Sequence, residues 1–355
     1  MTGADVDAVY DRVGRAPQGV RKDARLSTGY GMVVGAGAPL MSILLAVSGW
    51  DPAPWRRRLT SLLPSHKMAT LDELFDRPSV RYALSWRHPP GALADLPNLQ
   101  AIFSLGAGVD HLFADPALPD RPIVRVVDPD LTERMSEWVV MHALAHLRQL
   151  RRYERQQRER IWADDDDDQP KAAEVQVGVL GLGVLGTDAA LKLGALGFKV
   201  AGWSASEKSL PGVACFHGSD GLNRMLAMTD MLVVLLPLTD ATRGLIDASL
   251  LSQLRRGGRL GGPILINAGR GGLQVEADIL AALDSGRLKG ASLDVFEREP
   301  LPTASRLWTH PAVYVSPHNA AVSTPEAVAA FVARQIEAHE RGEPLTNLVD
   351  RRRGY

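Results

Sequence analysis

Three ionisable side chains in the last third of the chain have the types that hydride transfer to a 2-oxo acid requires. Arg270 lies between two glycines, Glu299 precedes a proline and His318 follows one. A guanidinium can hold a substrate carboxylate in a bidentate manner and polarise the adjacent carbonyl. An imidazole can donate a proton near neutral pH, and a carboxylate bonded to it would orient it and raise its pKa. We therefore predict that these three residues are catalytic, although each alone could be an ordinary surface or loop residue.

A glycine-rich turn precedes these residues and is typical of a dinucleotide-binding site. Residues 175–180 are almost wholly apolar and predict a buried strand, and residues 185–196 predict a helix. Gly181, Gly183 and Gly186 fill the turn between them, where they allow a tight bend, a close approach of pyrophosphate and close packing of helix on strand. The alternative is a turn that binds no ligand. The predicted cofactor contacts in the turn are Gly181, Leu182, Gly183, Val184 and Leu185.

The residues after the next predicted strand favour NADP over NAD. NAD enzymes usually have a carboxylate at this point to bind the ribose hydroxyls, but this chain has Ser204 there. Ser204, Ser206 and Lys208 could bind a 2′-phosphate, whereas Glu207 would oppose one if it pointed inward. NADP is therefore the preferred cofactor, and NAD remains the alternative.

The composition favours a small-molecule enzyme of two domains. A chain of 355 residues exceeds one ordinary core, and its 45% hydrophobic and 23% charged residues are typical of globular proteins. The formal net charge of -1 offers no general attraction to nucleic acid or to an anionic membrane. Cys215 is the single cysteine, so there is no intrachain disulfide and no zinc-binding pattern, which fits a cytoplasmic protein without a metal.

The alternation of short apolar runs with amphipathic stretches predicts an α/β fold with two doubly wound parallel sheets and a cleft between them. Strands are predicted at 43–47, 82–86, 101–105, 123–127, 175–180, 199–203, 231–236, 264–267, 290–295 and 313–315. Helices are predicted at 54–63, 71–75, 132–162, 185–196, 222–227, 275–285 and 325–341.

The first part of the chain is predicted to be an extension of this fold. Residues 1–40 mix charges with glycine and show little periodicity, and either Met32 or Met41 could be the natural start. The apolar stretch 31–50 resembles a signal sequence, but Pro39 and several glycines interrupt it. A buried strand at 43–47 explains its apolar residues better than secretion does.

Three other patterns suggest functions that the sequence does not favour. His142 and His146 have the spacing of a metalloprotease motif, but Ala143 occupies the position of its catalytic glutamate. The basic run 151–160 is interleaved with glutamates, which favours a solvated helix face over nucleic-acid binding. The five aspartates at 164–168 predict a solvated loop rather than a metal site, because successive side chains rarely converge on one ion.

These motifs resemble the D-isomer-specific 2-hydroxyacid dehydrogenase family, and within it the glyoxylate/hydroxypyruvate reductase A type. The resemblance extends from residue 41 to the C-terminus and implies a discontinuous substrate-binding domain, 41–131 with 320–355, around a dinucleotide-binding domain, 132–319. It also implies a homodimer formed through the dinucleotide-binding domain. The segments that carry the resemblance are 104–110, 235–237 with Thr242, 267–271, 281–286, 293–296, 317–318 and 349–355.

The resemblance further implies roles for individual positions. Arg270 would bind the substrate carboxylate together with the backbone N–H groups of Ala107 and Gly108, and His318 would be the general acid with Glu299 as its partner. Asp294 would bond the nicotinamide carboxamide. The remaining cofactor contacts would be Leu236, Pro237 and Ala268.

Two features bear on substrate size. Trp86 ends a predicted strand of the first domain. It either lines the pocket or is an ordinary residue of the hydrophobic core. The segment 162–168 is expected near the pocket mouth, where its acidic run would disfavour larger anions. The favoured function is reduction of a small 2-oxo acid, glyoxylate or hydroxypyruvate. The alternatives are a dehydrogenase for a bulkier 2-oxo acid and a non-catalytic nucleotide-sensing regulator.

Overall fold

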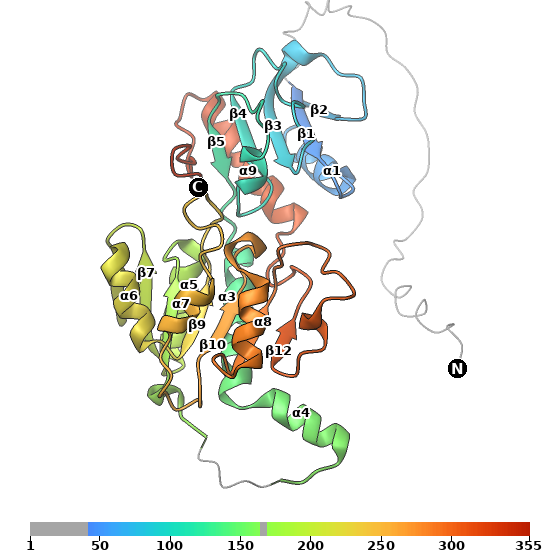
Figure 1. The fold of residues 1–355 in the computed structure, drawn as a ribbon. Helices are drawn as coiled ribbons and strands as arrows, with labels where there is room; N and C mark the ends of the chain where they lie inside the picture. The colour runs from blue at the N-terminus through green and yellow to red at the C-terminus, as the bar shows by residue number, and fades with distance from the viewer. Residues whose placement is uncertain (1–41, 164–168) are drawn as a thin grey trace, which may run out of the picture. The chain divides into compact units, whose positions relative to one another are not determined.

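The structure is a computed structural model that describes residues 42–163 and 169–355 (Figure 1). The predictions made for residues 1–40 and for the aspartate run 164–168 lie outside the described residues. Among the helices that are described, none is both long enough and apolar enough to span a membrane.

The first part of the chain forms a five-stranded parallel sheet. Its order is β2-β1-β3-β4-β5, so the strand order reverses between β1 and β3. Ile43 in β1 and Leu84 in β3 are fully buried, as expected for the centre of a parallel sheet covered on both faces. The strands are β1 Ser42–Val47, β2 Lys67–Thr70, β3 Val80–Trp86, β4 Ala101–Ser104 and β5 Ile123–Arg125.

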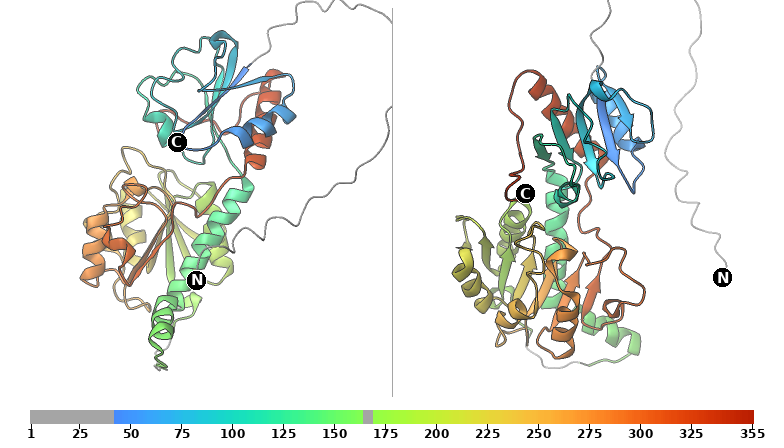
Figure 2. Two further views of the ribbon diagram at one scale, coloured as in Figure 1. Left: turned by 90° about the vertical axis from the view of Figure 1, so that its right-hand side faces the viewer. Right: turned by 45° about the horizontal axis from the view of Figure 1, so that its top comes forward.

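One face of this sheet is covered by helices from opposite ends of the chain. Helix α1 (Ala53–Leu62) and helix α9 (Pro325–Glu340) lie side by side against the strands (Figure 1 and Figure 2). Leu59 of α1 and Val332 of α9 belong to the same buried cluster as Leu84. The short helix α2 (Asp110–Phe113) follows β4.

The second sheet is parallel and has seven strands. Its order is β12-β11-β10-β9-β6-β7-β8, and the reversal lies between β6 and β9. In an open sheet of this kind ligands collect at the carboxyl ends of the strands near the reversal. The strands are β6 Gln176–Leu180, β7 Lys199–Ser204, β8 Val213–His217, β9 Met231–Val234, β10 Ile264–Asn267, β11 Gly290–Leu293 and β12 Val313–Val315.

Helices cover both faces of the second sheet. On one face, Val139 of α3 and Leu193 of α5 pack in a single buried cluster with the strands. On the other, Leu226 of α6 and Ile279 of α8 do the same. The predicted fold class, two doubly wound parallel sheets, is therefore confirmed. The helices are α3 Pro129–Leu147, α4 Leu150–Glu159, α5 Val184–Ala195, α6 Gly218–Met228, α7 Ala248–Gln253 and α8 Glu276–Asp284.

The single long helix predicted at 132–162 is wrong, because the chain breaks into α3 and α4. Gln149 between them has a left-handed backbone conformation, with φ of 55°. Leu147 ends the buried stripe of α3, and α4 buries none of its side chains. Packing against the sheet therefore does not keep α3 and α4 together as one straight helix. Trp162, expected near the pocket mouth, is 95% exposed and does not line the pocket described below.

Edge elements account for the other differences from the predictions. The predicted helix 71–75 is a turn whose Leu74 is fully exposed, because so short a segment does not form a stable helix. Strands β2 and β8, which were not predicted, lie at sheet edges. β2 has only four residues, two of them polar, and the residues of β8 are half-buried or exposed. Helix α7, also not predicted, has only six residues.

Candidate active site

The three predicted catalytic residues line one cavity of about 240 Å³. Each follows the carboxyl end of a strand of the second sheet, Arg270 after β10, Glu299 after β11 and His318 after β12. Residues that follow β3 and β4 of the first sheet complete the walls. The lining residues are Trp86, Arg87, Asp110, His111, Leu238, Arg270, Gly271, Gly272, Phe296, Glu297, Glu299 and His318.

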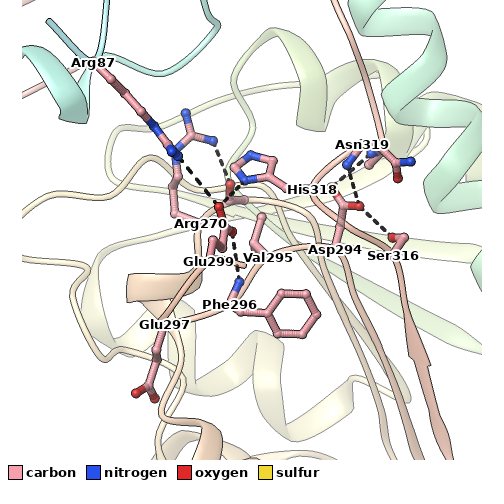
Figure 3. Close-up of polar contacts among 12 residues, drawn as sticks. Arg87, Arg270, Asp294, Val295, Phe296, Glu297, Glu299, Ser316, His318 and Asn319 are labelled. Carbon is pink, nitrogen blue, oxygen red and sulfur yellow. Dashed lines mark hydrogen bonds and ion pairs between the residues drawn. The ribbon is translucent and has the colours of Figure 1, made fainter. Parts of the chain in front are cut away.

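His318 and Glu299 form a hydrogen-bonded pair (Figure 3). Nδ1 of His318 lies 2.8 Å from Oε2 of Glu299, and the backbone N–H of Phe296 donates to Oε1 of the same carboxylate. Burial opposes ionisation of Glu299, but the hydrogen bond and charge of His318, with smaller contributions from Phe296 and Arg87, hold the pKa of this carboxyl below its ordinary value. A carboxylate on Nδ1 leaves Nε2 of the imidazole as the nitrogen that can exchange a proton with a ligand.

Asp294 holds the loop that carries His318. Its Oδ1 accepts from Oγ of Ser316 at 2.6 Å and from the backbone N–H of Asn319 at 3.0 Å, and its Oδ2 accepts from the N–H of Ala320. The N–H of His318 donates to the Asp294 carbonyl at 2.8 Å. These bonds restrain His318 in a left-handed backbone conformation, with φ of 53°. The bond from Asp294 to a nicotinamide stays a prediction.

Arg270 reaches the loop after β4 in the first sheet. Its Nε donates to Oδ1 of Asp110 at 3.0 Å, and its Nη1 donates to the Gly269 carbonyl at 2.9 Å. A Cβ atom at Gly108 would overlap Nη2 of Arg270, so only glycine permits this contact. Gly108, predicted with Ala107 to bind the substrate carboxylate, is therefore brought against the predicted cation.

Sequence reasoning missed three charged residues of the cavity, Arg87, Asp110 and Glu297. Asp110 closes the glycine-containing segment after β4, but only the backbone of that segment was considered. Arg87 directly follows Trp86, and its Nη2 lies 3.7 Å from Oε2 of Glu299. The residue types alone carried no signal for these pairs, because their partners lie far along the chain.

Trp86 forms an aromatic wall of the cavity. Its ring centroid lies 4.7 Å from that of Trp50 and 5.0 Å from that of His111, and a Cβ atom at Gly106 would overlap the indole. Burial lowers the pKa of His111 to about 4, so this second histidine of the cavity is neutral at pH 7. The wall is therefore both rigidly packed and uncharged.

The glycine turn has the features that a bound dinucleotide needs. Gly181 has φ of 102°, and a Cβ atom there would lie 2.7 Å from the carbonyl oxygen of Leu235. A Cβ atom at Gly186 would overlap the Gly181 carbonyl, whereas one at Gly183 would meet no atom within 4 Å. The backbone at Gly183 thus faces open space at the amino end of α5, where helix N–H groups lack intrahelical partners. The residues present fit a pyrophosphate.

The other predicted cofactor residues differ in accessibility. Leu182, Leu236 and Ala268 are at most 8% exposed, so they would contact a cofactor mainly through their backbone. Ser204 is also buried, and its Oγ donates to the carbonyl of Ser206 at 2.7 Å. The other predicted cofactor residues in these loops are more accessible: Val184, Leu185, Ser206, Lys208 and Pro237.

His142 and His146 face the second sheet rather than a metal. Both rings lie 2.9 Å from Oγ of Ser292 in β11, and burial lowers the pKa of His142 to about 4. Burial, with the charges of His142 and Arg151, lowers the pKa of His146 to about 3. Within residues 42–163 and 169–355, no group of three or more His, Cys, Asp or Glu side chains could hold a metal ion.

Comparison with known proteins agrees with this geometry. Residues 140–320 match the family model of the D-isomer specific 2-hydroxyacid dehydrogenase NAD binding domain. The chain is 39% identical over 321 residues to glyoxylate/hydroxypyruvate reductase A of Escherichia fergusonii, which covers 89% of this chain and 100% of that protein.

Solved structures show the same likeness. An NADPH-dependent glyoxylate/hydroxypyruvate reductase of Sinorhizobium meliloti, in complex with NADP and sulfate, is 48% identical with a TM-score of 0.83, over 89% of this chain and 100% of that one. A probable 2-hydroxyacid dehydrogenase of Rhizobium etli, in complex with NADP, HEPES and L(+)-tartaric acid, is 47% identical with a TM-score of 0.84 over the same shares. The chain belongs to the D-isomer specific 2-hydroxyacid dehydrogenase family, as its sequence predicted.

Proposed function

We propose that the protein is an NADPH-dependent reductase that converts a small 2-oxo acid, glyoxylate or hydroxypyruvate, to the 2-hydroxy acid. The observation that carries the proposal is the bond between His318 and Glu299 in the cavity that Arg270 also lines. This combination supplies a proton donor and a carboxylate-binding cation in one place. A nucleotide-sensing regulator, the alternative of another class, would have no use for the proton donor.

The residues divide the reaction between them. Arg270 and the backbone of Ala107 and Gly108 bind the substrate carboxylate and so orient the carbonyl. A reduced nicotinamide, when bound, would supply the hydride that reaches the carbonyl carbon. His318 donates the Nε2 proton to the carbonyl oxygen, which becomes the new hydroxyl, and Glu299 stabilises the imidazolium before that transfer. The imidazole is then reprotonated from solvent.

Cofactor choice is assigned to the loop after β7. The hydroxyl of Ser204 already donates its hydrogen bond to the backbone carbonyl of Ser206. The exposed Lys208 and the hydroxyl of Ser206 therefore remain to bind a 2′-phosphate. The solved relatives from Sinorhizobium meliloti and Rhizobium etli both hold NADP, which supports the same choice. NAD is the weaker cofactor in this proposal.

The cavity favours a small substrate over a bulkier 2-oxo acid. Its volume is about 240 Å³. Trp86 limits it on one side, and charged or polar side chains form much of the remaining wall. A compact acid with a short polar substituent therefore fits better than one with a branched apolar chain.

The organisation of the chain completes the proposal. Residues 41–131 and 320–355 form the substrate-binding part, and residues 132–319 form the dinucleotide-binding part. A homodimer through the dinucleotide-binding part is supported by exposed apolar side chains on and after α3, among them Met141, Tyr153 and Trp162. The free thiol of Cys215 supports a cytoplasmic location.

The test is the loss of reduced-nicotinamide absorbance with NADPH and with NADH, against glyoxylate, hydroxypyruvate, pyruvate and a branched 2-oxo acid. The proposal expects oxidation of NADPH with the first two acids at the highest kcat/KM. Lys208→Ala should lower the NADPH to NADH ratio of kcat/KM about tenfold, as loss of one charged hydrogen bond predicts.

The matched control is Lys199→Ala. It removes an exposed lysine from the start of β7, at the end of the strand away from the loop that carries Lys208, and should leave the NADPH to NADH ratio of kcat/KM unchanged. Tight binding of NADPH without turnover of any of the four acids would contradict the reductase and favour the regulator. A preference for the branched acid would favour the alternative dehydrogenase.

A further inference from the structure

Asp110 is the one acidic side chain hydrogen-bonded to the Arg270 guanidinium among the described residues. The bond is specific, since Oδ1 of Asp110 lies 3.0 Å from Nε, the donor closest to the aliphatic part of the arginine. The two side chains are 29% and 23% exposed. They come from different sheets, because Asp110 begins α2 after β4 and Arg270 follows β10.

This bond determines which edge of the guanidinium stays available. A guanidinium has five N–H donors in one plane. Asp110 takes the donor on Nε, and the Gly269 carbonyl takes one on Nη1. Nη2 then lies over Gly108, at a position that any Cβ atom on Gly108 would occupy. The free donors are therefore directed toward the loop whose backbone is proposed to bind a carboxylate.

We propose that Asp110 is a positioning residue that orients Arg270 so that its Nη donors and the backbone at Gly108 bind one carboxylate together. The identity of that carboxylate, a 2-oxo acid, rests on the proposed function. The positioning itself rests only on the contacts between the two side chains and Gly108.

Substitution of Asp110 distinguishes positioning from simple charge neutralisation. If Asp110 acted only as a counter-charge, it would compete with an anionic ligand, and its removal would tighten binding of that ligand. A positioning residue has the opposite effect, because an arginine without its Nε partner can rotate away from Gly108. Asparagine separates the two cases, since its carbonyl oxygen accepts the Nε hydrogen bond without a charge.

The experiment compares Asp110→Ala and Asp110→Asn with the unchanged protein, all saturated with NADPH. Calorimetry measures the Kd of oxamate, a carboxylate that resembles a 2-oxo acid and is not reduced. Steady-state assays then give KM and kcat for glyoxylate. Asp110→Ala should raise the oxamate Kd and the glyoxylate KM about 10- to 100-fold, the usual effect of losing a hydrogen bond to a charged group. Asp110→Asn should recover most of that loss.

Two controls separate this effect from damage to the fold. NADPH affinity and the melting temperature should stay unchanged in both variants, since Asp110 lies on the substrate side of the cavity. Asp95→Ala removes another acidic partner of an arginine in the first part of the chain, at 4.0 Å from Arg77 and 84% exposed, and should leave oxamate binding unchanged.

The outcomes are distinct. Tighter or unchanged oxamate binding in Asp110→Ala would overturn the proposal and assign Asp110 a counter-charge role. Equal losses in the alanine and asparagine variants would also overturn it, because the hydrogen bond would then not be what matters. If the unchanged protein binds oxamate but reduces no 2-oxo acid, the proposed function fails while the oxamate series still tests the positioning.

Discussion

The imidazole of His318 and the carboxylate of Glu299 meet through Nδ1 and Oε2 at 2.8 Å, although the two residues follow different strands. The bond selects the nitrogen of His318 that remains for a ligand, and it places a negative charge against the imidazole. Arg87, from the first sheet, lies 3.7 Å from the same carboxylate oxygen. Glu299 therefore has one cationic neighbour in addition to the proposed acid.

His318→Ala should lower kcat by about 100- to 10,000-fold, the usual contribution of a positioned general acid. NADPH affinity should stay nearly unchanged, because the imidazole is not proposed to bind the cofactor. Stopped-flow or steady-state absorbance gives kcat, and fluorescence titration gives the NADPH Kd. Glu343→Gln, at an exposed ion pair, is a control for general effects of altering a charged side chain. A His318→Ala variant with near-normal turnover would remove His318 from the mechanism.

Gly183→Ala should weaken NADPH binding without destabilising the protein. The added methyl group meets no protein atom within 4 Å, but it would occupy the space in which a pyrophosphate approaches the backbone. We expect the NADPH Kd to rise about tenfold or more, as expected when hydrogen bonds to a charged phosphate are lost. Gly257→Ala, which also meets no atom within 4 Å, should change neither the Kd nor the melting temperature.

Gly186→Ala, at the same turn, should destabilise the protein, unlike Gly183→Ala. Its Cβ atom would overlap the Gly181 carbonyl, so the backbone of the turn must move. Thermal unfolding should show a lower melting temperature for this variant and not for Gly183→Ala. If Gly183→Ala lowered the melting temperature as much as Gly186→Ala does, the space at Gly183 would not be open.

Trp86→Val should enlarge the cavity and broaden the range of substrates. The indole is held by Trp50 and His111, so the protein cannot simply move it aside for a larger ligand. The ratio of kcat/KM for a branched 2-oxo acid over glyoxylate should rise about tenfold or more, since each accommodated methylene is worth at least that in a fitted pocket. Trp308→Val, outside the cavity, is the control. An unchanged ratio would show that Trp86 is ordinary core.

The stability of the protein should fall as the pH drops from about 6.5 toward 5, in part because of His142 and His146 and in part because of His111, whose pKa burial also lowers. Burial lowers the pKa values of His142 and His146 from 6.5 to about 4 and about 3 in the folded chain. Above pH 6.5 both states hold these rings neutral, so no stability is lost. Below it the unfolded chain takes up protons that the folded chain cannot, which lowers the free energy of unfolding by up to about 2 kcal/mol per ring at pH 5.

Urea unfolding at pH 7.5, 6.5 and 5 measures this dependence. His142→Gln and His146→Gln should each reduce the fall in unfolding free energy between pH 6.5 and 5, even if they lower stability at pH 7.5. His217→Gln, at an exposed histidine, should leave the dependence unchanged. A pH dependence that is the same in all three variants would show that the buried rings do not cause it.

Much of the fold could be predicted from local patterns. Central strands such as β6 and β10 are almost wholly apolar, because a parallel sheet covered on both faces buries every side chain. Edge elements such as β2 and β8 were missed, because a strand paired on one side needs no such run. The break at Gln149 was also missed, since it depends on where packing against the sheet ends.

The sequence by itself determined the chemical groups and their order: a glycine turn for a dinucleotide, then Arg270, Glu299 and His318. The proximity of these groups could be predicted because each follows a predictable strand, and parallel strands bring their carboxyl ends to one edge of the sheet. Only the tertiary structure decided that Asp110 bonds Arg270, that Arg87 approaches Glu299 and which glycines face open space. Those contacts join separate sheets, and periodicity along one chain records how deeply a residue is buried but not which distant residue it meets.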